Sequence, residues 1–269
     1  MVVYAGQGDP RRSMSLLWRD AGPAAARTGP GPKPGLSVDL VVDTAIELAD
    51  AEGMPALSMR AVGERLGRTA MALYTYVPGK NELIDLMYDR ALAELPTDYP
   101  ADEGWRGAVN AWADDLWGFY LRHPWVLQVS QARPVLGPNE YGVLEALVRA
   151  LDGTGLAAGE LRRVVGTLFH VVRGAAQTIA ESRHAAAATG VSDEEWWFAR
   201  AGVLREVAPD FAERFPMVLR LEADQAAGWE DDGSPYLERE AKRTFEAGLA
   251  VVLDGIEAAM ARTQRDGAR

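Results

Sequence analysis

Apolar residues recur at helical spacing through almost all of the chain from Leu36 onward, and this pattern limits the folds that the chain can adopt. Ser or Thr precedes several of these apolar stretches, and Gly or Pro ends them. A small polar residue caps the first free amides of a helix, whereas Gly and Pro interrupt helices. No run of alternating apolar and polar residues indicates a strand. The sequence therefore predicts an all-α fold.

The first 35 residues differ from the rest because they are rich in Gly, Pro, Ala and Arg. The run from Gly29 to Gly35 is built almost entirely of Gly and Pro and cannot sustain regular backbone hydrogen bonds. We therefore expect a flexible N-terminal arm over residues 1–35. An apolar island in it leaves two alternatives: a loosely docked arm, or a short helix that presents Arg11, Arg12 and Arg19 to a phosphate backbone.

A Pro- and Asp-rich stretch at 96–103 divides the remaining chain into two regions. A length of 269 residues also suits one to two domains at about 150 residues each. We predict one domain over residues 36–95 and a larger one over 96–269.

Residues 37–80 hold three short helical stretches in succession. Ser58 precedes the second stretch, which ends at Gly67, and Thr69 precedes a third that runs to about Val77. Two short helices joined by a Gly-containing turn are typical of a helix-turn-helix, whose second helix enters the major groove of DNA. An ordinary helical hairpin can have the same turn, so the side-chain types must decide between the two.

The exposed positions of this segment carry side chains suited to DNA. Hydroxyl groups and cations bind phosphate oxygens, and the small or slim side chains at 70–72 allow close approach to base edges. The candidate DNA-binding residues are Arg60, Thr69, Ala70, Met71, Ala72, Tyr74, Thr75, Tyr76 and Lys80.

The run from 36 to 95 resembles the DNA-binding domain of the tetracycline-repressor (TetR) family of bacterial transcription regulators. Three pieces carry the resemblance in the right order and spacing: AIELADAEG at 45–53, LSMRAVGERLG at 57–67 and LYTYVPGK at 73–80. Trp105, the RHP sequence at 122–124 and the stretch around His170 are similar to the ligand-binding domain of the repressor that gives the family its name.

The resemblance implies roles for individual residues. Arg60 and residues 70–72 match base-facing positions, and Tyr74 and Tyr76 match phosphate-contacting positions. Lys80 matches a lysine at a helix N-terminus, where the helix dipole also favours phosphate. The resemblance further implies a small-molecule site between the helices of the second domain.

The net charge of −11 argues against a nucleic-acid partner only as long as it is averaged over the whole chain. Residues 1–80 hold nine Lys and Arg against eight Asp and Glu, which leaves −12 for residues 81–269. Residues 54–80 hold four basic residues against one acidic residue. The sequence thus predicts a weakly basic head on an acidic body, which should bind random DNA poorly.

Aromatic and polar side chains are concentrated together in the second domain. A helical domain of this composition can line an apolar pocket with a few polar anchors, although each aromatic side chain can equally pack in the core. The candidate ligand-binding residues are Trp112, Leu116, Gln131, Phe169, His170 and Arg173.

The sequence offers no metal site or cofactor motif. The family's namesake uses a histidine metal ligand shortly before an Arg-Pro pair, whereas residues 129–134 contain no histidine, so the resemblance carries neither the metal nor tetracycline. The chain has no Cys, which excludes thiolate metal sites and thiol-based redox sensing. An enzyme would need His123 or His170 as a general base, but no positioned nucleophile, acid pair or cofactor loop accompanies them. We expect no metal, no cofactor and no enzymatic activity.

Two long helical stretches, 160–183 and 235–262, match the helices that the family uses for dimerisation. Two copies of each would form a four-helix interface, and packing within one chain is the alternative. The residues expected at this interface are Gly166, Gly174, Ala175, Ala176, Phe245, Leu249, Val252 and Ile256.

The leading hypothesis is a homodimer that binds a double-stranded DNA operator and is released from it by a small apolar or amphipathic effector. The chain has no apolar stretch of about 18 residues and no secretory signal at 1–8, so we expect a cytoplasmic protein without membrane contact. The alternative hypothesis is an effector-independent dimer whose second domain serves only dimerisation or a protein partner.

Overall fold

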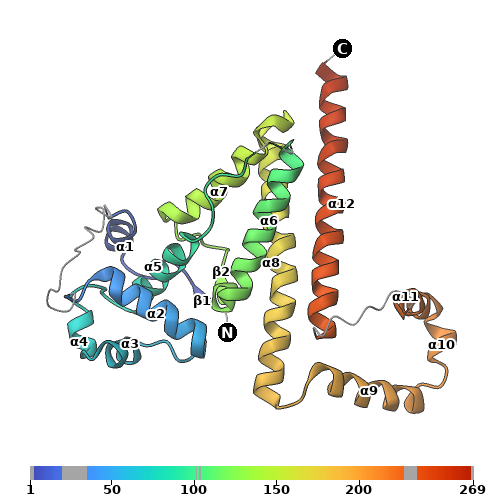
Figure 1. The fold of residues 1–269 in the computed structure, drawn as a ribbon, viewed down its shortest axis with the longest axis horizontal. Helices are drawn as coiled ribbons and strands as arrows, with labels where there is room; N and C mark the ends of the chain where they lie inside the picture. The colour runs from blue at the N-terminus through green and yellow to red at the C-terminus, as the bar shows by residue number, and fades with distance from the viewer. Residues whose placement is uncertain (1–2, 20–34, 101, 103, 227–234, 268–269) are drawn as a thin grey trace. The chain divides into compact units, whose positions relative to one another are not determined.

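The computed structural model describes residues 3–19, 35–100, 102, 104–226 and 235–267. Within these ranges the regular secondary structure is helical apart from two strands of two residues each, so the all-α prediction is confirmed (Figure 1). The elements follow in the order β1 (Val3–Tyr4), α1 (Pro10–Leu17), α2 (Val38–Glu52), α3 (Met59–Leu66), α4 (Ala70–Leu73), α5 (Lys80–Leu92), α6 (Gly104–Arg122), η2 (Pro124–Gln128), β2 (Val129–Ser130), α7 (Pro138–Ala150), η3 (Asp152–Thr154), α8 (Ala158–Thr189), α9 (Asp193–Val207), α10 (Phe211–Arg214), α11 (Pro216–Ala226) and α12 (Tyr236–Gly267).

The chain divides into two compact units. The first comprises Met1–Arg173 and Leu249–Arg269, and the second comprises Gly174–Gly248. The chain passes from one unit to the other after Arg173, inside helix α8, and after Gly248, inside helix α12. The domain boundary predicted at 95/96 lies inside the first unit.

The N-terminal helices of the first unit begin and end where the local sequence directs. Ser37 caps α2 by accepting the Leu40 N–H at 3.1 Å, and Gly53 ends this helix. Helix α2 packs on α3 and α5, and α3 packs on α4. The core of this small bundle consists of fully buried aliphatic side chains: Val41, Val42, Leu48, Val62, Leu73, Val77 and Leu83.

The remainder of the first unit is built around α6 and α7, which pack against each other, while α7 also packs on α5. Trp112, Phe119 and Trp125 have at most 1% of their surface exposed and form the largest part of this core. Because α5 packs on both α2 and α7, it joins the small N-terminal bundle to the rest of the unit.

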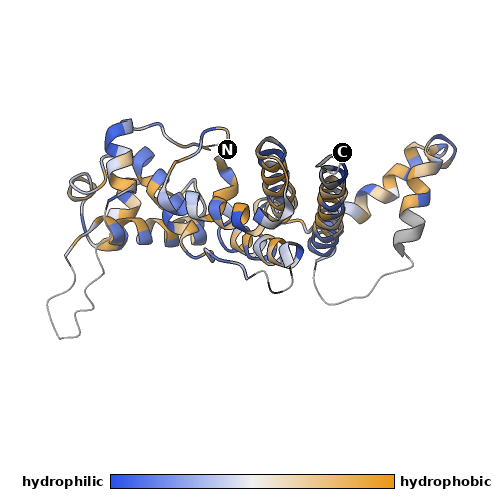
Figure 2. Cartoon of the chain, turned by 90° about the horizontal axis from the view of Figure 1, so that it is seen from above, coloured by the Kyte–Doolittle hydropathy of each residue, from blue (hydrophilic) through white to orange (hydrophobic). Residues whose placement is uncertain are grey.

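The second unit contains the end of α8, then α9, α10 and α11, and the start of α12. Ser192 and Glu195 form a capping box at the start of α9. Within the described part of the chain none of the α9 side chains is buried. Large apolar side chains are exposed on α9 and α11, where hydrophobic colour extends over the helices (Figure 2).

The N-terminal residues differ from the expected flexible arm. Residues 3–19 form β1, which pairs with β2 in parallel, and α1, which packs on α5. Ala5 and Leu17 are almost fully buried there, at 1% and 5% exposure, and this burial holds the segment against the protein. The short helix anticipated as one alternative is present, but Arg19 pairs with Asp39 while Arg11 and Arg12 remain exposed.

The Gly/Pro-rich part of the expected N-terminal arm, up to residue 34, lies outside the described residues.

Candidate nucleic-acid interface and effector site

Helices α3 and α4 and the turn between them form a helix-turn-helix. The Ser58 hydroxyl accepts the Ala61 N–H at 3.1 Å at the start of α3, and Gly67 ends this helix in the left-handed conformation. The Thr69 hydroxyl accepts the Ala72 N–H and starts α4. These predicted caps are confirmed. Helix α4 ends at Leu73, earlier than expected, because residues 74–77 form turns ahead of Pro78, which disfavours helical geometry in the residue before it.

A glycine inside α3 sets how closely the two helices approach. A Cβ atom added at Gly63 would lie 2.8 Å from the carbonyl oxygen of Arg68 and 3.3 Å from the amide nitrogen of Ala70. Both atoms belong to the backbone of the turn and cannot rotate away. The absence of a side chain at Gly63 therefore allows the turn to pack directly on α3.

The short helix α4 has one buried face and one exposed face. Leu73 and the following Val77 are fully buried, whereas Met71 is 74% exposed and Tyr74 is 41% exposed. The structure therefore leaves the first turn of α4 accessible. The candidate DNA-binding residues on exposed or half-exposed positions are Arg60, Thr69, Ala70, Met71, Ala72, Tyr74, Thr75, Tyr76 and Lys80.

The basic residues of this segment do not all have the same surroundings. The Arg60 side chain is 84% exposed and has only a loose pair with Glu64 at 3.6 Å. Arg65, on the same helix, donates to Glu52 of α2 at 2.6 Å. The Lys80 ammonium donates to the Leu57 carbonyl at 2.6 Å, which ties the start of α5 to the start of α3. Arg60 is thus available to a ligand, whereas Arg65 stabilises the bundle.

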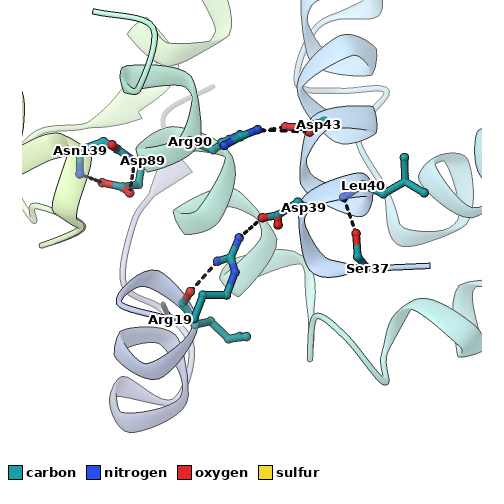
Figure 3. Close-up of polar contacts among 9 residues, drawn as sticks. Arg19, Ser37, Asp39, Leu40, Asp43, Asp89, Arg90 and Asn139 are labelled. Atoms are coloured by element: carbon teal, nitrogen blue, oxygen red, sulfur yellow. Dashed lines mark hydrogen bonds and ion pairs between the residues drawn. The ribbon is translucent and has the colours of Figure 1, made fainter. Parts of the chain in front are cut away.

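Helix α5 is held by carboxylates and arginines on several sides (Figure 3). Asp89 accepts the backbone N–H groups of Asn139 and Glu140, both at 2.9 Å, and thereby caps the start of α7. Arg90 donates to Asp43 of α2 at 3.0 Å. A movement of α7 would therefore act directly on α5, which follows the helix-turn-helix in the chain.

A histidine joins α2 to α6 and η2. His123 contacts Asp50 through Nδ1 at 2.8 Å and Glu94 through Nε2 at 3.2 Å, and the Trp125 indole also donates to Asp50 at 2.8 Å. Burial alone would lower the pKa of His123, but its hydrogen bonds and charge attraction to the two carboxylates raise it. The resulting charged junction connects the small bundle to the larger domain.

Two candidate ligand-binding aromatics lie in contact between α6 and α8. Trp112 meets Phe169 edge-on, with ring centroids 4.9 Å apart and planes at 88°. Trp112 and the neighbouring Leu116 are each 1% exposed. The Trp112 indole nitrogen is buried and has no hydrogen-bond partner in the described part of the chain. A buried donor without an acceptor destabilises the folded protein, so an acceptor placed beside this nitrogen would stabilise it.

Two further candidates meet one turn along α8. Arg173 donates through Nη2 to the carbonyls of Leu127 at 2.5 Å and Val129 at 2.9 Å, and its guanidinium lies 5.9 Å from the centre of the Tyr120 ring. Gln131 contacts the Tyr120 hydroxyl at 3.5 Å. The Nη1 atom of Arg173 is buried and unpaired within the described residues. His170 is exposed and lies outside this group. The helical pattern of the sequence alone does not show that His170 lies apart from the other candidates.

Two phenols of this region were not among the candidates. Tyr120 of α6 contacts Arg173, and Tyr88 of α5 hydrogen-bonds Gln131. Burial raises the pKa of both phenols above the usual value for tyrosine, although Arg173 opposes the shift, so both remain neutral. Tyr120 lies one turn from the candidate Leu116, which was a signal, but helical spacing serves core tyrosines equally well. No ligand-binding candidate lies on α5 to draw attention to Tyr88.

The described residues contain no cluster of three or more His, Asp or Glu side chains that could hold a metal ion. Among the helices in those ranges, none combines the length and apolar character needed to cross a membrane.

The geometry of α3, α4 and α5 defines a helix-turn-helix DNA-binding protein with a larger helical domain attached. Residues 41–87 match the family model of bacterial regulatory proteins of the tetR family, and residues 97–260 match that of the tetracyclin repressor-like C-terminal domain. The chain therefore belongs to the TetR family of transcription regulators, as its sequence motifs predicted, and it is not an enzyme.

Known relatives extend over almost the whole chain. It is 39% identical over 267 residues to the HTH-type transcriptional repressor DrrR1 of Streptomyces coeruleorubidus, a match that spans 98% of this chain and 92% of the relative. It is 28% identical over 224 residues to the class A tetracycline repressor protein from transposon 1721 of Escherichia coli, with 82% and 90% covered. ActR of Streptomyces coelicolor in complex with actinorhodin has a similar structure, with a TM-score of 0.63, 26% identity, and 83% and 96% covered.

Proposed function

We propose that this regulator is a homodimeric repressor that binds a duplex operator in the cytoplasm and leaves it when a small amphipathic molecule enters the larger domain. The observation that carries the DNA-binding part is the exposed first turn of α4, held on α3 by the close turn at Gly63. This arrangement presents small side chains to base edges, with Arg60 and the tyrosines beside them.

Selection of duplexes from random DNA, followed by fluorescence polarisation, tests the DNA interface. We expect Arg60→Ala to weaken binding to the selected duplex by about tenfold or more, because a good base contact contributes roughly 1–3 kcal/mol. Arg65→Ala is the matched control, since Arg65 lies on the same helix but pairs with Glu52. Equal losses in the two variants would exclude Arg60 as a DNA contact.

The effector site that we propose lies around the two unpaired donors in the larger domain. Trp112 Nε1 and Arg173 Nη1 are buried donors that a ligand oxygen would satisfy. ActR binds actinorhodin and (S)-DNPA in the structures of those complexes. An aromatic molecule with oxygen acceptors would suit the aromatic rings and donors of this chain, and Leu116, Phe169 and Gln131 would complete its surroundings.

Thermal unfolding with actinorhodin as the first probe tests this site. We expect stabilisation in the unsubstituted protein and a smaller shift in Trp112→Phe, which keeps an aromatic ring but removes the indole N–H. A compound that stabilises both proteins equally binds without using this donor.

The homodimer that we propose uses exposed faces of α8 and α12. Among the residues expected at this interface, Phe245, Leu249 and Ile256 are buried within the chain, which favours an interface on the outer faces of these helices. The outer face of α12 carries small residues and Val251, which is 70% exposed. Light scattering should detect a dimer, and Val251→Glu should shift it toward the monomer. An unchanged dimer in this variant would place the interface elsewhere.

The burial of Trp112 and Leu116 favours a second candidate function, an effector-independent dimer. In that case the larger domain is a packed core that serves only dimerisation or a protein partner. A compound that both stabilises the protein and releases it from DNA excludes this candidate.

A further inference from the structure

The N-terminal residues 3–19, here called the N-terminal strap, contact β2, which adjoins the proposed effector site, and also helices α2 and α5 of the DNA-binding bundle. The strap consists of β1, a stretch without regular secondary structure over residues 5–9, helix α1, and the two residues that follow it. None of the family motifs found in the sequence lies within it.

The irregular stretch of the strap, residues 5–9, is anchored on α5. The Gly6 N–H donates to Asp85 at 2.9 Å, and the Asp9 N–H donates to Glu82 at 3.3 Å. Asp85 and Glu82 are only 2% and 8% exposed. A Cβ atom at the intervening Gly8 would lie 2.1 Å from a Glu82 carboxylate oxygen, so the backbone of the strap lies directly on this side chain.

The beginning of the strap is anchored on β2. Val3 pairs with Val129, and Tyr4 pairs with Ser130, in a parallel ladder. The Val129 carbonyl also accepts a hydrogen bond from Arg173 at 2.9 Å. One strand residue therefore contacts both the strap and the arginine of the proposed effector site.

The end of the strap is anchored beside α7 and on α2. The Trp18 indole donates to the Leu136 carbonyl at 2.9 Å, and Leu136 has a φ of 63°, a conformation that non-glycine residues rarely adopt. Arg19 pairs with Asp39 at the start of α2 (Figure 3). The strap thus contacts both helices that support the helix-turn-helix, α2 and α5.

We propose that the N-terminal strap transmits effector occupancy from Arg173 to α5 and so helps to set the position of the DNA-binding bundle. This inference rests on the proposed effector site. A ligand acceptor that attracts the Arg173 guanidinium competes with the two backbone carbonyls that hold it. Release of Val129 changes the strand to which the strap is paired, and the strap carries this change to Asp85 and Glu82. The ligand acts because it stabilises one of two arrangements more than the other.

A direct route also exists, because the Tyr120 ring contacts Arg173, the Tyr120 hydroxyl contacts Gln131, and Gln131 hydrogen-bonds Tyr88 of α5. The two routes make different predictions. If the direct route dominates, loosening the strap leaves the response of α5 to a change at Arg173 intact. If the strap dominates, loosening it removes that response.

A double-mutant cycle read by hydrogen exchange separates the two routes without requiring DNA or an effector. Arg173→Met imitates withdrawal of the guanidinium from the carbonyls. Gly8→Val displaces the Glu82 carboxylate, which removes its hydrogen bond from the Asp9 N–H and so loosens the strap. Gln7→Val places the same side chain on the neighbouring exposed residue as the matched control. We expect Arg173→Met to accelerate exchange of the α5 amides by about fivefold or more in the Gln7→Val background, and by less than about twofold in the Gly8→Val background.

Equal acceleration in the two backgrounds would overturn the proposal, as would no acceleration in either. Far-ultraviolet circular dichroism confirms that each variant is folded before exchange is measured. The operator assay is kept separate: if random DNA yields no selected duplex, the proposed function fails, while the exchange cycle still decides whether the strap couples Arg173 to α5.

Discussion

Because the turn between α3 and α4 packs closely on Gly63, the effect of adding one methyl group there, in Gly63→Ala, can be estimated. In Gly63→Ala the new Cβ atom would lie 2.8 Å from the Arg68 carbonyl oxygen, closer than real Cβ contacts come. The Ala70 nitrogen and the Thr69 carbonyl carbon, each at 3.3 Å, leave no room on the other side. The backbone of the turn must therefore move, and α4 must move with it.

The magnitude follows from two opposing terms. Ala is favoured over Gly inside a helix by roughly 0.5–1 kcal/mol. Forcing an additional methyl group into a packed contact costs roughly 1–3 kcal/mol. The expected net result is a loss of about 1 kcal/mol in the free energy of unfolding, which corresponds to a decrease of about 2–4 °C in Tm.

The assay measures stability and DNA affinity on the same samples. Gly142→Ala in α7 is the matched control, because the nearest atom to its new Cβ would be a Thr97 methyl carbon at an ordinary 3.9 Å. This control should gain about 0.5–1 kcal/mol and bind the selected operator like the unsubstituted protein. Gly63→Ala should lose stability and bind the operator about tenfold or more weakly, because its displaced recognition helix no longer fits the groove.

Stabilisation of Gly63→Ala equal to that of Gly142→Ala, together with full operator affinity, would contradict this prediction. Such a result would mean that the turn is not packed on α3 as closely as the backbone distances indicate.

Three further predictions concern the charged groups around α5. Burial alone would lower the pKa of His123, but its two carboxylate partners raise it. The stability that the charged imidazole adds is therefore full below the free-imidazole pKa of 6.5 and is lost as pH rises through the higher folded-state pKa. In denaturant titrations His123→Gln should cost less stability at about pH 8 than at about pH 6. Burial raises the pKa of Asp85 to about 6, so the stability that its protonated form contributes is full below the free-carboxyl pKa of 3.8 and is lost as pH rises through about 6. Asp85→Asn should therefore raise Tm more at about pH 8 than at about pH 4.5, and an equal effect at both pH values would contradict this reasoning. Asp89→Ala removes the cap of α7 and should lower the free energy of unfolding in urea by about 1–2 kcal/mol. Asp43→Ala breaks an exposed pair with Arg90 and should lower it by less than about 1 kcal/mol. Equal losses in the two variants would contradict the capping role of Asp89.

The parts of the fold that follow from neighbouring residues could be predicted from the sequence. Ser37, Ser58 and Ser192 cap helices because their hydroxyls reach amides three residues away, and Gly67 ends α3 because it adopts a left-handed conformation. These interactions depend on only a few adjacent residues, so the local sequence contains the necessary information.

The parts that depend on distant residues could not be predicted. The strap docks through Asp85 and Leu136, which lie 79 and 118 positions away from their partners in the strap. The apolar stripe of α12 suits either a dimer interface or the core of one chain, and the structure buries Phe245 and Leu249 in the core. Helical spacing identifies an apolar face but does not identify what covers it.

The candidate sites were predictable to different extents for the same reason. The DNA-binding candidates form a continuous segment, so local structure places most of them on one surface. The ligand-binding candidates come from α6, α8 and the stretch after β2, and only tertiary packing brings Trp112 to Phe169 and Arg173 to Tyr120 while leaving His170 exposed.

The central claim is that one molecule links a ligand in the larger domain to the affinity of α4 for DNA. The most direct test is a polarisation titration of the selected operator at fixed salt, with and without a compound that stabilises the protein in thermal unfolding. We expect the compound to weaken operator binding by about tenfold or more, and operator DNA to weaken binding of the compound by the same factor. Operator affinity that remains unchanged at saturating compound would contradict the central claim.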